Sequence, residues 1–310
     1  MHKPRIVVVG TRWRDKNSEM AYVVRSLAAA ASQWAEVLVL VPNGEPIEAD
    51  GAFDLIGFDP RAGQSEGLLR DSTIVVDDLT PEVQAVLPAG TPDRVFTLTG
   101  PPLGANVPTR LLPMVPTGAL RRFVHLFVPV NPLAERHRHN GFGFTGYTLV
   151  LSGRSVEGAD PPAAAAWLTA RFPQHDVIVV ERGIASAWKG RALRGRVPVD
   201  SRIDLWRLVA HAKVCVDLAP GSLIGRECVE ALRFGTPIVV PHGSGPAEVH
   251  ANSGGGSSFR DPEELFQAVA AFDEHKARSA ASGQGRAYAE GAYGDALSFV
   301  SSLRHELSQV

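Results

Sequence analysis

The sequence passes twice through the same alternation of apolar strands and amphipathic helices, and no other feature limits the fold as strongly. A β-branched run occupies residues 5–9 and ends at Gly10. Apolar residues at three- and four-residue spacing predict a helix over residues 19–31, and a second apolar run follows at residues 36–41. Because buried strands that alternate with such helices form parallel sheets covered on both faces, the first half predicts a Rossmann-like α/β domain.

The alternation restarts in the second half. Proline and glycine are frequent over residues 129–146, where few apolar positions follow either period, so we place the domain boundary there. Further strands are expected in the first half at residues 53–57, 73–76, 95–99 and 123–128, and in the second half at 147–151, 177–180, 214–218 and 238–241. Helices of the second half are expected at residues 160–172, 202–212, 225–234 and 262–272.

Two doubly wound domains follow from this pattern. The N-terminal Rossmann-like domain takes residues 1–130, a linker takes 131–146, and the C-terminal Rossmann-like domain takes 147–292. An amphipathic helix within residues 293–310 is expected to pack back onto the N-terminal domain. Because ligands of open α/β sheets bind beyond the carboxyl ends of the strands, we expect the domains to face a cleft lined by those loops. The loops concerned follow Val9, Leu151, Val180, Leu218 and Val240.

Composition excludes several classes of function. The 310 residues carry 31 basic and 33 acidic side chains, a near-balance that argues against a nucleic-acid partner. The two cysteines, Cys215 and Cys228, lie in apolar runs, which excludes a disulfide framework and a cysteine-rich zinc site. No apolar stretch approaches the roughly 18 residues of a membrane span, and the first residues do not resemble a signal peptide. We therefore expect a cytoplasmic protein without a transmembrane segment.

Residues 204–270 carry the most specific pattern. A strand and a loop lead into Gly225-Arg-Glu-Cys-Val-Glu-Ala, Gly235-Thr-Pro follows, and a glycine-bearing loop ends at Glu248 before Asp261-Pro-Glu-Glu-Leu. This order resembles the donor-binding half of retaining GT-B-type glycosyltransferases. In that family a Glu is followed after seven residues by Glu-Ala, then Gly-x-Pro, a loop ending in Glu, and Asp-Pro-x-x-Leu before a helix. The resemblance covers the C-terminal half; in the N-terminal half it rests on architecture alone.

The resemblance implies a GT-B architecture and the transfer of a sugar from a nucleotide-diphosphate sugar with retention at the anomeric carbon. It places the ribose hydroxyls of a UDP- or GDP-linked donor on Glu230, and the diphosphate on Arg154 after the first strand of the second domain. A carboxylate accepts two hydroxyl hydrogen bonds at once, and arginine binds a diphosphate through two parallel N–H groups. The acceptor stays unidentified, and no cofactor beyond this co-substrate is expected.

Two departures from the family pattern bear on catalysis. Ser222 stands where the family has its first, sugar-facing glutamate, and of the glycines around it only Gly225 is kept. A hydroxyl in place of that carboxylate removes a charge-assisted hydrogen bond to the sugar. No histidine occurs between His2 and His125, so the acceptor-side histidine of many relatives has no counterpart. Arg154 and Ser222 are the predicted catalytic residues.

The lysine that follows the arginine in the family is also missing. Residues 181–196 hold five basic side chains against one acidic one, and Lys189 in this run is a candidate for the diphosphate. The same run is equally typical of a solvated basic loop. Gly243, Ser244 and Gly245 offer backbone amides to the donor, or form only a tight turn.

In the N-terminal domain, the loop after residue 9 carries the candidates for acceptor or phosphate binding. These are Thr11, Arg12 and Arg14, for which a solvated loop is an equal alternative. The string Asp77-Asp78-Leu-Thr-Pro holds carboxylates that would suit a metal ion, but threonine followed by proline is typical of a helix start. We therefore expect no bound metal.

The leading hypothesis is a metal-independent glycosyltransferase that uses a nucleotide-sugar donor. The first alternative is a catalytically degenerate relative that binds a nucleotide sugar, or a partner, without turnover. Ser222, the missing lysine and the missing histidine favour that alternative. The second alternative is a nucleotide-sugar epimerase on the same scaffold, for which the sequence offers no clear set of acidic and basic residues at a sugar ring.

Overall fold

A computed structural model describes the chain over residues 3–11, 13, 19–42, 54–58, 69, 71–77, 80–85, 87, 95–98, 110–111, 142, 146–151, 161–181, 183–189, 192–218, 225–293 and 296–308. Two compact units divide the chain. Unit 1 consists of Met1–Phe127 and Asp295–Val310, and unit 2 consists of Val128–Gly294. The predicted linker, residues 131–146, lies almost entirely outside the described residues.

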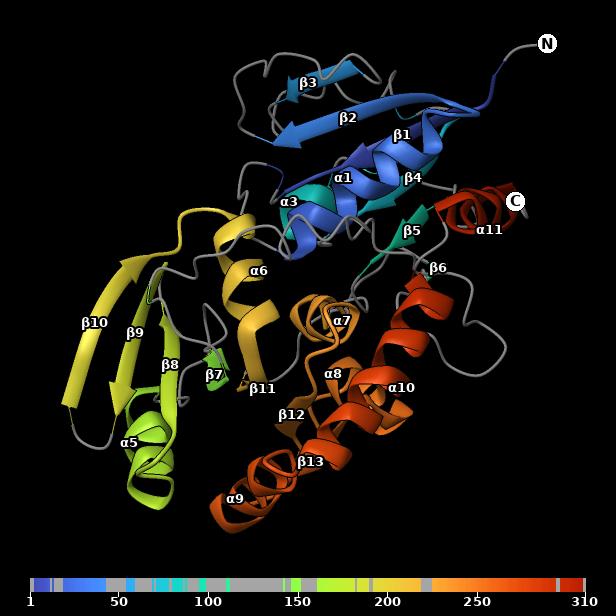
Figure 1. Cartoon of the computed structure of the whole chain (residues 1–310). Helices are drawn as coiled ribbons and strands as arrows, with labels where there is room; N and C mark the ends of the chain where they lie inside the picture. Colours follow the sequence, from blue (N-terminus) through green and yellow to red (C-terminus); the bar gives the residue numbers. More distant parts are fainter. Residues whose placement is uncertain are drawn as a thin grey trace. The chain divides into compact units, whose positions relative to one another are not determined.

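Unit 1 is built on a six-stranded parallel sheet of order β3-β2-β1-β4-β5-β6 (Figure 1). Its strands are β1 (Arg5–Val9), β2 (Glu36–Pro42), β3 (Asp54–Phe58), β4 (Thr73–Val76), β5 (Val95–Thr97) and β6 (Arg110–Leu111). Strand β6 was not predicted, because two residues carry no readable period. The strand predicted at residues 123–128 lies outside the described residues.

Three described helices belong to unit 1. They are α1 (Glu19–Ala31), α3 (Pro81–Gln84) and α11 (Ala296–Ser308). Helix α1 buries Val23, Val24 and Leu27, as the spacing of its apolar residues predicted. The Thr80 hydroxyl accepts a hydrogen bond from the Val83 N–H and caps α3, so the aspartates before it lead into a helix, as expected. Helix α11 packs against α1 within the unit.

Unit 2 is built on a seven-stranded sheet of order β10-β9-β8-β7-β11-β12-β13. Its strands are β7 (Tyr147–Leu151), β8 (Asp176–Glu181), β9 (Ile184–Lys189), β10 (Ala192–Pro198), β11 (Ala212–Asp217), β12 (Ile238–Pro241) and β13 (Gly256–Phe259). The five strands from β8 to β13 in this order pair in parallel, whereas β9 and β10 extend the sheet as an antiparallel hairpin. With a doubly wound parallel sheet in each unit, the predicted fold class is confirmed.

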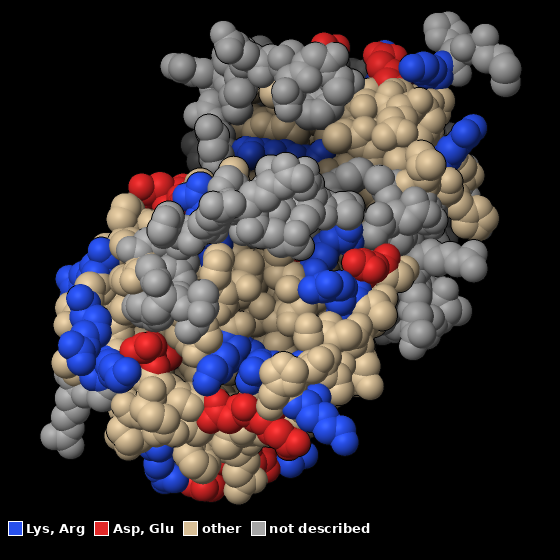
Figure 2. Space-filling view, viewed as in Figure 1, with Lys and Arg blue, Asp and Glu red and all other residues tan. Residues whose placement is uncertain are grey.

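The hairpin overturns one alternative considered for residues 181–196. Within this range, Ile184–Lys189 and the residues from Ala192 on form paired strands and not a loop, because Ala185 and Ala187 alternate with more polar positions and are buried. The basic side chains nevertheless face solvent: Lys189, Arg194 and Arg196 are exposed, and Figure 2 shows Lys and Arg gathered over the hairpin.

The described helices of unit 2 pack against its sheet or against one another. They are α5 (Pro161–Arg171), α6 (Arg202–His211), α7 (Arg226–Arg233), α8 (Pro246–His250), α9 (Pro262–Ala271) and α10 (His275–Tyr293), with a π-helical turn at Ala251–Gly255. Helix α10 was missed in the sequence because its residues are mostly polar or small and give no apolar stripe. Among the described helices, none has the length and apolar character needed to cross a membrane.

The strand order of unit 2 places a switch point between β7 and β11. Strand β8, which follows β7 in the chain, pairs on one side of β7, while β11 pairs on the other. Leu151 and Asp217 are register partners at the carboxyl ends of β7 and β11. The carboxyl ends of these two strands therefore lie side by side, at the position where doubly wound sheets bind ligands.

Glycines let α10 lie close to α7 and to the π-helical turn. A Cβ atom on Gly285 would stand 2.7 Å from Leu232 Cδ2 and 3.0 Å from the Gly255 Cα. Gly283, on the same helix, is exposed and would place its Cβ in open space. The two glycines thus occupy the same secondary structure in opposite surroundings.

We expect Gly285→Ala to lower the free energy of unfolding by about 1–3 kcal/mol, because the added methyl group overpacks the α7–α10 contact. Gly283→Ala should raise it by about 0.5–1 kcal/mol, because alanine loses less backbone entropy in a helix. Urea denaturation of both variants measures the two effects. Equal changes in the two variants would contradict the packing of α10 described above.

Candidate functional site

Helix α7 begins beside the switch point, and a glycine makes its first residue possible. Gly225 caps the helix with a positive φ of 66°. A Cβ atom there would stand 2.8 Å from Cδ2 of the buried His250 ring, so both the backbone conformation and the space require glycine. His250 Nδ1 lies 2.9 Å from the Tyr288 hydroxyl, which ties this ring to α10. The buried His250 ring therefore fixes the position at which α7 starts.

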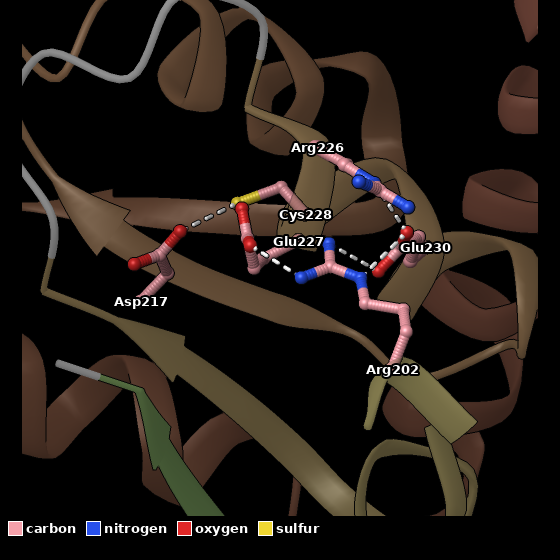
Figure 3. Close-up of polar contacts among 6 residues, drawn as sticks. All are labelled: Arg202, Asp217, Arg226, Glu227, Cys228 and Glu230. Carbon is pink, nitrogen blue, oxygen red and sulfur yellow. Dashed lines mark hydrogen bonds and ion pairs between the residues drawn. The ribbon is translucent and has the colours of Figure 1, made fainter. Parts of the chain in front are cut away.

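Glu230, one turn along α7, is buried in an ion cluster (Figure 3). Its side chain is 1% exposed. Oε1 accepts hydrogen bonds from Nε of Arg202 at 3.0 Å and from Nε of Arg226 at 2.8 Å. Oε2 forms an ion pair with Nη2 of Arg202 at 2.6 Å. Glu230 is thus not a solvated helix residue, and its predicted role at a ribose stays a prediction.

Arg202 joins two glutamates of α7. It is the first residue of α6, whose start is fixed by a capping box between Ser201 and Asp204. Because α6 leads directly into the amino end of β11, its own first residue lies at the carboxyl edge of the sheet. There Nη1 of Arg202 donates to Oε1 of Glu227 at 2.8 Å, while Nε and Nη2 face Glu230. The planar guanidinium fork suits this two-sided contact.

Electrostatics keep Arg202 and Glu227 charged although burial opposes their charges. Burial opposes the charge of Arg202, but the carboxylates of Glu230 and Glu227 outweigh it and raise the pKa of Arg202 further above its ordinary range. Burial also opposes ionisation of Glu227, yet the Arg202 guanidinium lowers the pKa of that carboxyl below its ordinary value. Arg202 and Glu227 therefore stay charged, and ion pairs join Arg202 to both glutamates and Arg226 to Glu230.

We expect Arg202→Met to lower the free energy of unfolding by about 3 kcal/mol, because it leaves the buried Glu230 with one arginine and removes the ion pair of Glu227. Arg207→Met is the matched control on the same helix. Arg207 pairs with Asp204 at 3.0 Å and both side chains are about one-third exposed, so a loss below about 1 kcal/mol is expected. Denaturant titration compares the two. A small loss in both variants would show that the cluster does not stabilise the fold.

Next to the cluster, Asp217 and Cys215 lie on β11 and Cys228 lies on α7. Cys228 Sγ donates to Asp217 Oδ2 at 3.4 Å. Burial raises the pKa of both Cys215 and Cys228, and the Asp217 charge adds to the effect. Both thiols are therefore held protonated, which makes them poor nucleophiles and poor metal ligands. Within the described part of the chain, no three His, Cys, Asp or Glu side chains gather as a metal site would need.

The turn at residues 243–245, which was predicted to offer backbone amides to the donor, is held by the carboxylate of Glu248. The Gly243 N–H donates to Glu248 Oε2 at 2.9 Å, and His242 Nδ1 lies 2.6 Å from Glu248 Oε1. The Ser244 N–H donates to the Pro241 carbonyl at 3.2 Å. Hydrogen bonds within the protein therefore use the backbone amides of Gly243 and Ser244, as the tight-turn alternative expects. A contact between the Gly245 amide and the donor stays a prediction.

We expect Glu248→Gln to lower the free energy of unfolding at neutral pH by about 0.5–1 kcal/mol. The Gly243 N–H holds the pKa of Glu248 below its ordinary value of 4.5, with His242 adding to the effect. Its contribution is therefore present above pH 4.5 and is lost as the pH falls through the lower, folded-state pKa. Urea titrations at pH 7 and below the folded-state pKa check this. A difference between wild type and variant that does not shrink in acid would contradict it.

In unit 1, Thr11 is held at the corresponding switch point. Its N–H and its hydroxyl donate to Asp77 Oδ1 at 2.9 Å and 2.8 Å, joining the carboxyl ends of β1 and β4. The Thr11 hydroxyl therefore positions the start of the loop. Its predicted phosphate contact stays a prediction, as do those of Arg12 and Arg14, which lie outside the described residues.

The other predicted donor residues divide into three groups. Arg154 and Ser222 lie outside the described residues, and in the sequence they follow β7 and β11. Glu230 and Gly225 lie together on α7. Lys189 ends β9 and pairs with Asp176 at 3.8 Å, where β8 begins. It therefore lies at the amino edge of the sheet, opposite the edge where Leu151 and Asp217 end.

Sequence reasoning missed Arg202 and gave Glu227 no role beyond that of a helical neighbour. The capping sequence Ser201-Arg-Ile-Asp204 marks a helix start, but it does not say which carboxylate an arginine there will meet. Arg226 and Glu230, by contrast, are four residues apart on one helix, a spacing that pairs side chains by itself.

Comparison with solved structures shows which fold this is. WaaG, a glycosyltransferase involved in lipopolysaccharide biosynthesis, matches with a TM-score of 0.60 at 14% identity, over 98% of this chain and 99% of that one. A glycosyltransferase from Rickettsia africae matches with a TM-score of 0.65 at 8% identity, over 100% and 99%. Anabaena HepE in complex with UDP and glucose matches with a TM-score of 0.57 at 13% identity, over 100% of both chains.

No family model matches the sequence, and no curated protein sequence does either. At such low identity the likeness is one of fold: the chain has the two Rossmann-like domains of GT-B glycosyltransferases along its whole length.

Proposed function

We propose that the protein is a glycosyltransferase that moves a sugar from a nucleotide-diphosphate sugar to an acceptor, with retention at the anomeric carbon. The single observation that carries the proposal is the agreement between fold and site. A chain that matches glycosyltransferases from end to end also places its charged cluster at the carboxyl edge of unit 2, beside the β7–β11 switch point. HepE, one of the matching structures, was solved with UDP and with UDP-glucose.

The donor is proposed to bind beyond the carboxyl ends of β7 and β11. Arg154, in the loop after β7, would hold the diphosphate, and Ser222, in the loop after β11, would face the sugar. Arginine contacts of this kind stabilise the charge that develops on a departing diphosphate, so catalysis would be mainly electrostatic. Glu230, on α7, would accept the ribose hydroxyls. Lys189 has no part in this proposal, because it lies at the opposite edge of the sheet.

A binder without turnover is the second candidate, and one observation favours it. Ser222 stands where a sugar-facing carboxylate is expected, so the charge-assisted contact to the transferred sugar is absent. Hydrolysis of the donor separates the two candidates: a transferase releases the sugar slowly into water, whereas a binder does not. Proton NMR of the released sugar at early times then reports whether its anomeric configuration is retained.

We expect the wild-type protein to bind UDP or GDP in isothermal titration calorimetry, and Arg154→Ala to weaken that binding about 10- to 100-fold, since it removes a charged hydrogen-bond donor. Lys189→Ala is the matched loss of one basic charge and should leave the affinity unchanged. An Arg154→Ala variant with wild-type affinity would overturn the placement of the diphosphate. A wild-type protein that binds neither nucleotide would overturn the proposed function.

A further inference from the structure

His242 has a fixed place at the carboxyl edge of the sheet of unit 2. It directly follows β12, which ends at Pro241. Its backbone N–H donates to the carbonyl of Phe259, the last residue of β13, at 2.7 Å. Strand β11 pairs with β12 in parallel and ends at Asp217, so both strands end at one edge. The sheet therefore holds the His242 backbone at the edge where the donor is proposed to bind.

The turn that begins at His242 also adjoins the start of α7. It leads into α8, and the backbone nitrogen of Ala247 in that helix would stand 3.2 Å from a Cβ atom on Gly225. Gly225 caps α7, the helix that carries Glu230. His242 therefore belongs to the segment that connects β12 with a helix packed against the start of α7.

Glu248 decides which nitrogen of the His242 ring carries a proton. Glu248 Oε1 lies 2.6 Å from Nδ1 of the ring. The Gly243 N–H donates to Oε2 and holds the pKa of Glu248 below its ordinary value, so this group is a carboxylate at neutral pH. A carboxylate only accepts hydrogen bonds, and Nδ1 must therefore be the donor. In a neutral ring Nε2 is then an acceptor.

Nε2 is the end of the ring that a ligand can reach. The His242 side chain is 53% exposed, whereas the Glu248 side chain that holds it is 19% exposed. Among the residues that the structure describes, none forms a hydrogen bond with Nε2. Because Nδ1 is already held, the ring loses little further conformational entropy when a ligand binds at Nε2.

The charge of the His242–Glu248 pair selects the ligand chemistry. The pair is negative when the ring is neutral, and its net charge is zero when the ring is protonated. In neither state does it supply the net positive charge that attracts a diphosphate. A hydroxyl donates one hydrogen bond to one acceptor, and a sugar carries several hydroxyls. An acceptor nitrogen at this edge therefore suits the sugar of the donor and not its diphosphate.

We propose that Nε2 of His242 accepts a hydrogen bond from a hydroxyl of the transferred sugar, and that Glu248 is the positioning residue that fixes the ring. The inference rests on the proposed function, because it assumes a nucleotide-sugar donor at this edge. It gives the sugar an acceptor group besides Ser222, which has a hydroxyl where the family pattern has a carboxylate.

The experiment separates the sugar from the nucleotide. Isothermal titration calorimetry first identifies which of UDP-glucose, UDP-galactose and GDP-mannose binds the wild type most tightly. That donor and its bare nucleotide, UDP or GDP, are then titrated into His242→Ala and Glu248→Gln. His275→Ala is the matched control, because His275 is an exposed histidine of the same unit at the start of α10.

We expect His242→Ala to weaken binding of the nucleotide sugar about 3- to 30-fold and that of the bare nucleotide less than about twofold, since one hydrogen bond to the sugar is lost. Glu248→Gln should cause a smaller loss, again for the nucleotide sugar alone, because an amide no longer fixes the proton on Nδ1. His275→Ala should change neither affinity. Among monodeoxy forms of the sugar, one should bind the wild type and His242→Ala equally.

Three outcomes would overturn the inference, and they are distinguishable. Wild-type affinity of His242→Ala for the nucleotide sugar would remove the contact and leave the proposed function intact. An equal loss for nucleotide and nucleotide sugar would show that the ring supports the turn and not the sugar. A wild type that binds neither ligand would remove the proposed function as well. Should His242→Ala not fold, His242→Phe, which keeps a ring without Nε2, decides in its place.

Discussion

The ion cluster between α6 and α7 is the interaction on which the C-terminal unit's site depends. Arg202 reaches Glu227 and Glu230 at once, and Arg226 completes a set of two positive and two negative charges. Burial makes each charge costly by itself, so the four are stable only together. This mutual dependence fixes the first turn of α7 beside the β7–β11 switch point, which is where a donor would bind.

The glycines around the cluster also fix the position of α7. Because Gly225 has no Cβ atom, the His250 ring fits against it, and because Gly285 has none, Leu232 fits against it. Helix α7 is therefore held between α8 and α10 with no room for an added methyl group at either glycine. Close packing of this kind leaves the helix few alternative positions. The braced turn at Glu248 adds a second fixed segment, in which hydrogen bonds within the protein use the backbone amides of Gly243 and Ser244.

Most of the fold was predictable from the sequence, whereas the site was predictable only in part. Runs such as residues 5–9 and 147–151 identify strands because most of their residues are apolar and either β-branched or large. Helix α10 and the β9–β10 hairpin were missed, because glycine-rich or charged surface elements lack a strong apolar period. Lys189 was assigned by charge alone, and charge does not say at which edge of a sheet a side chain lies.

The sequence by itself determined two doubly wound units, the helix caps at Thr80 and Ser201, and the local pair of Arg226 with Glu230. Each depends on residues a few positions apart, so the chain's own periodicity specifies it. Only the tertiary structure decided that Glu230 is buried and that Arg202 is its partner from 28 residues away. The crossover through β11 brings α6 and α7 together, and no local pattern encodes which of two glutamates then faces solvent.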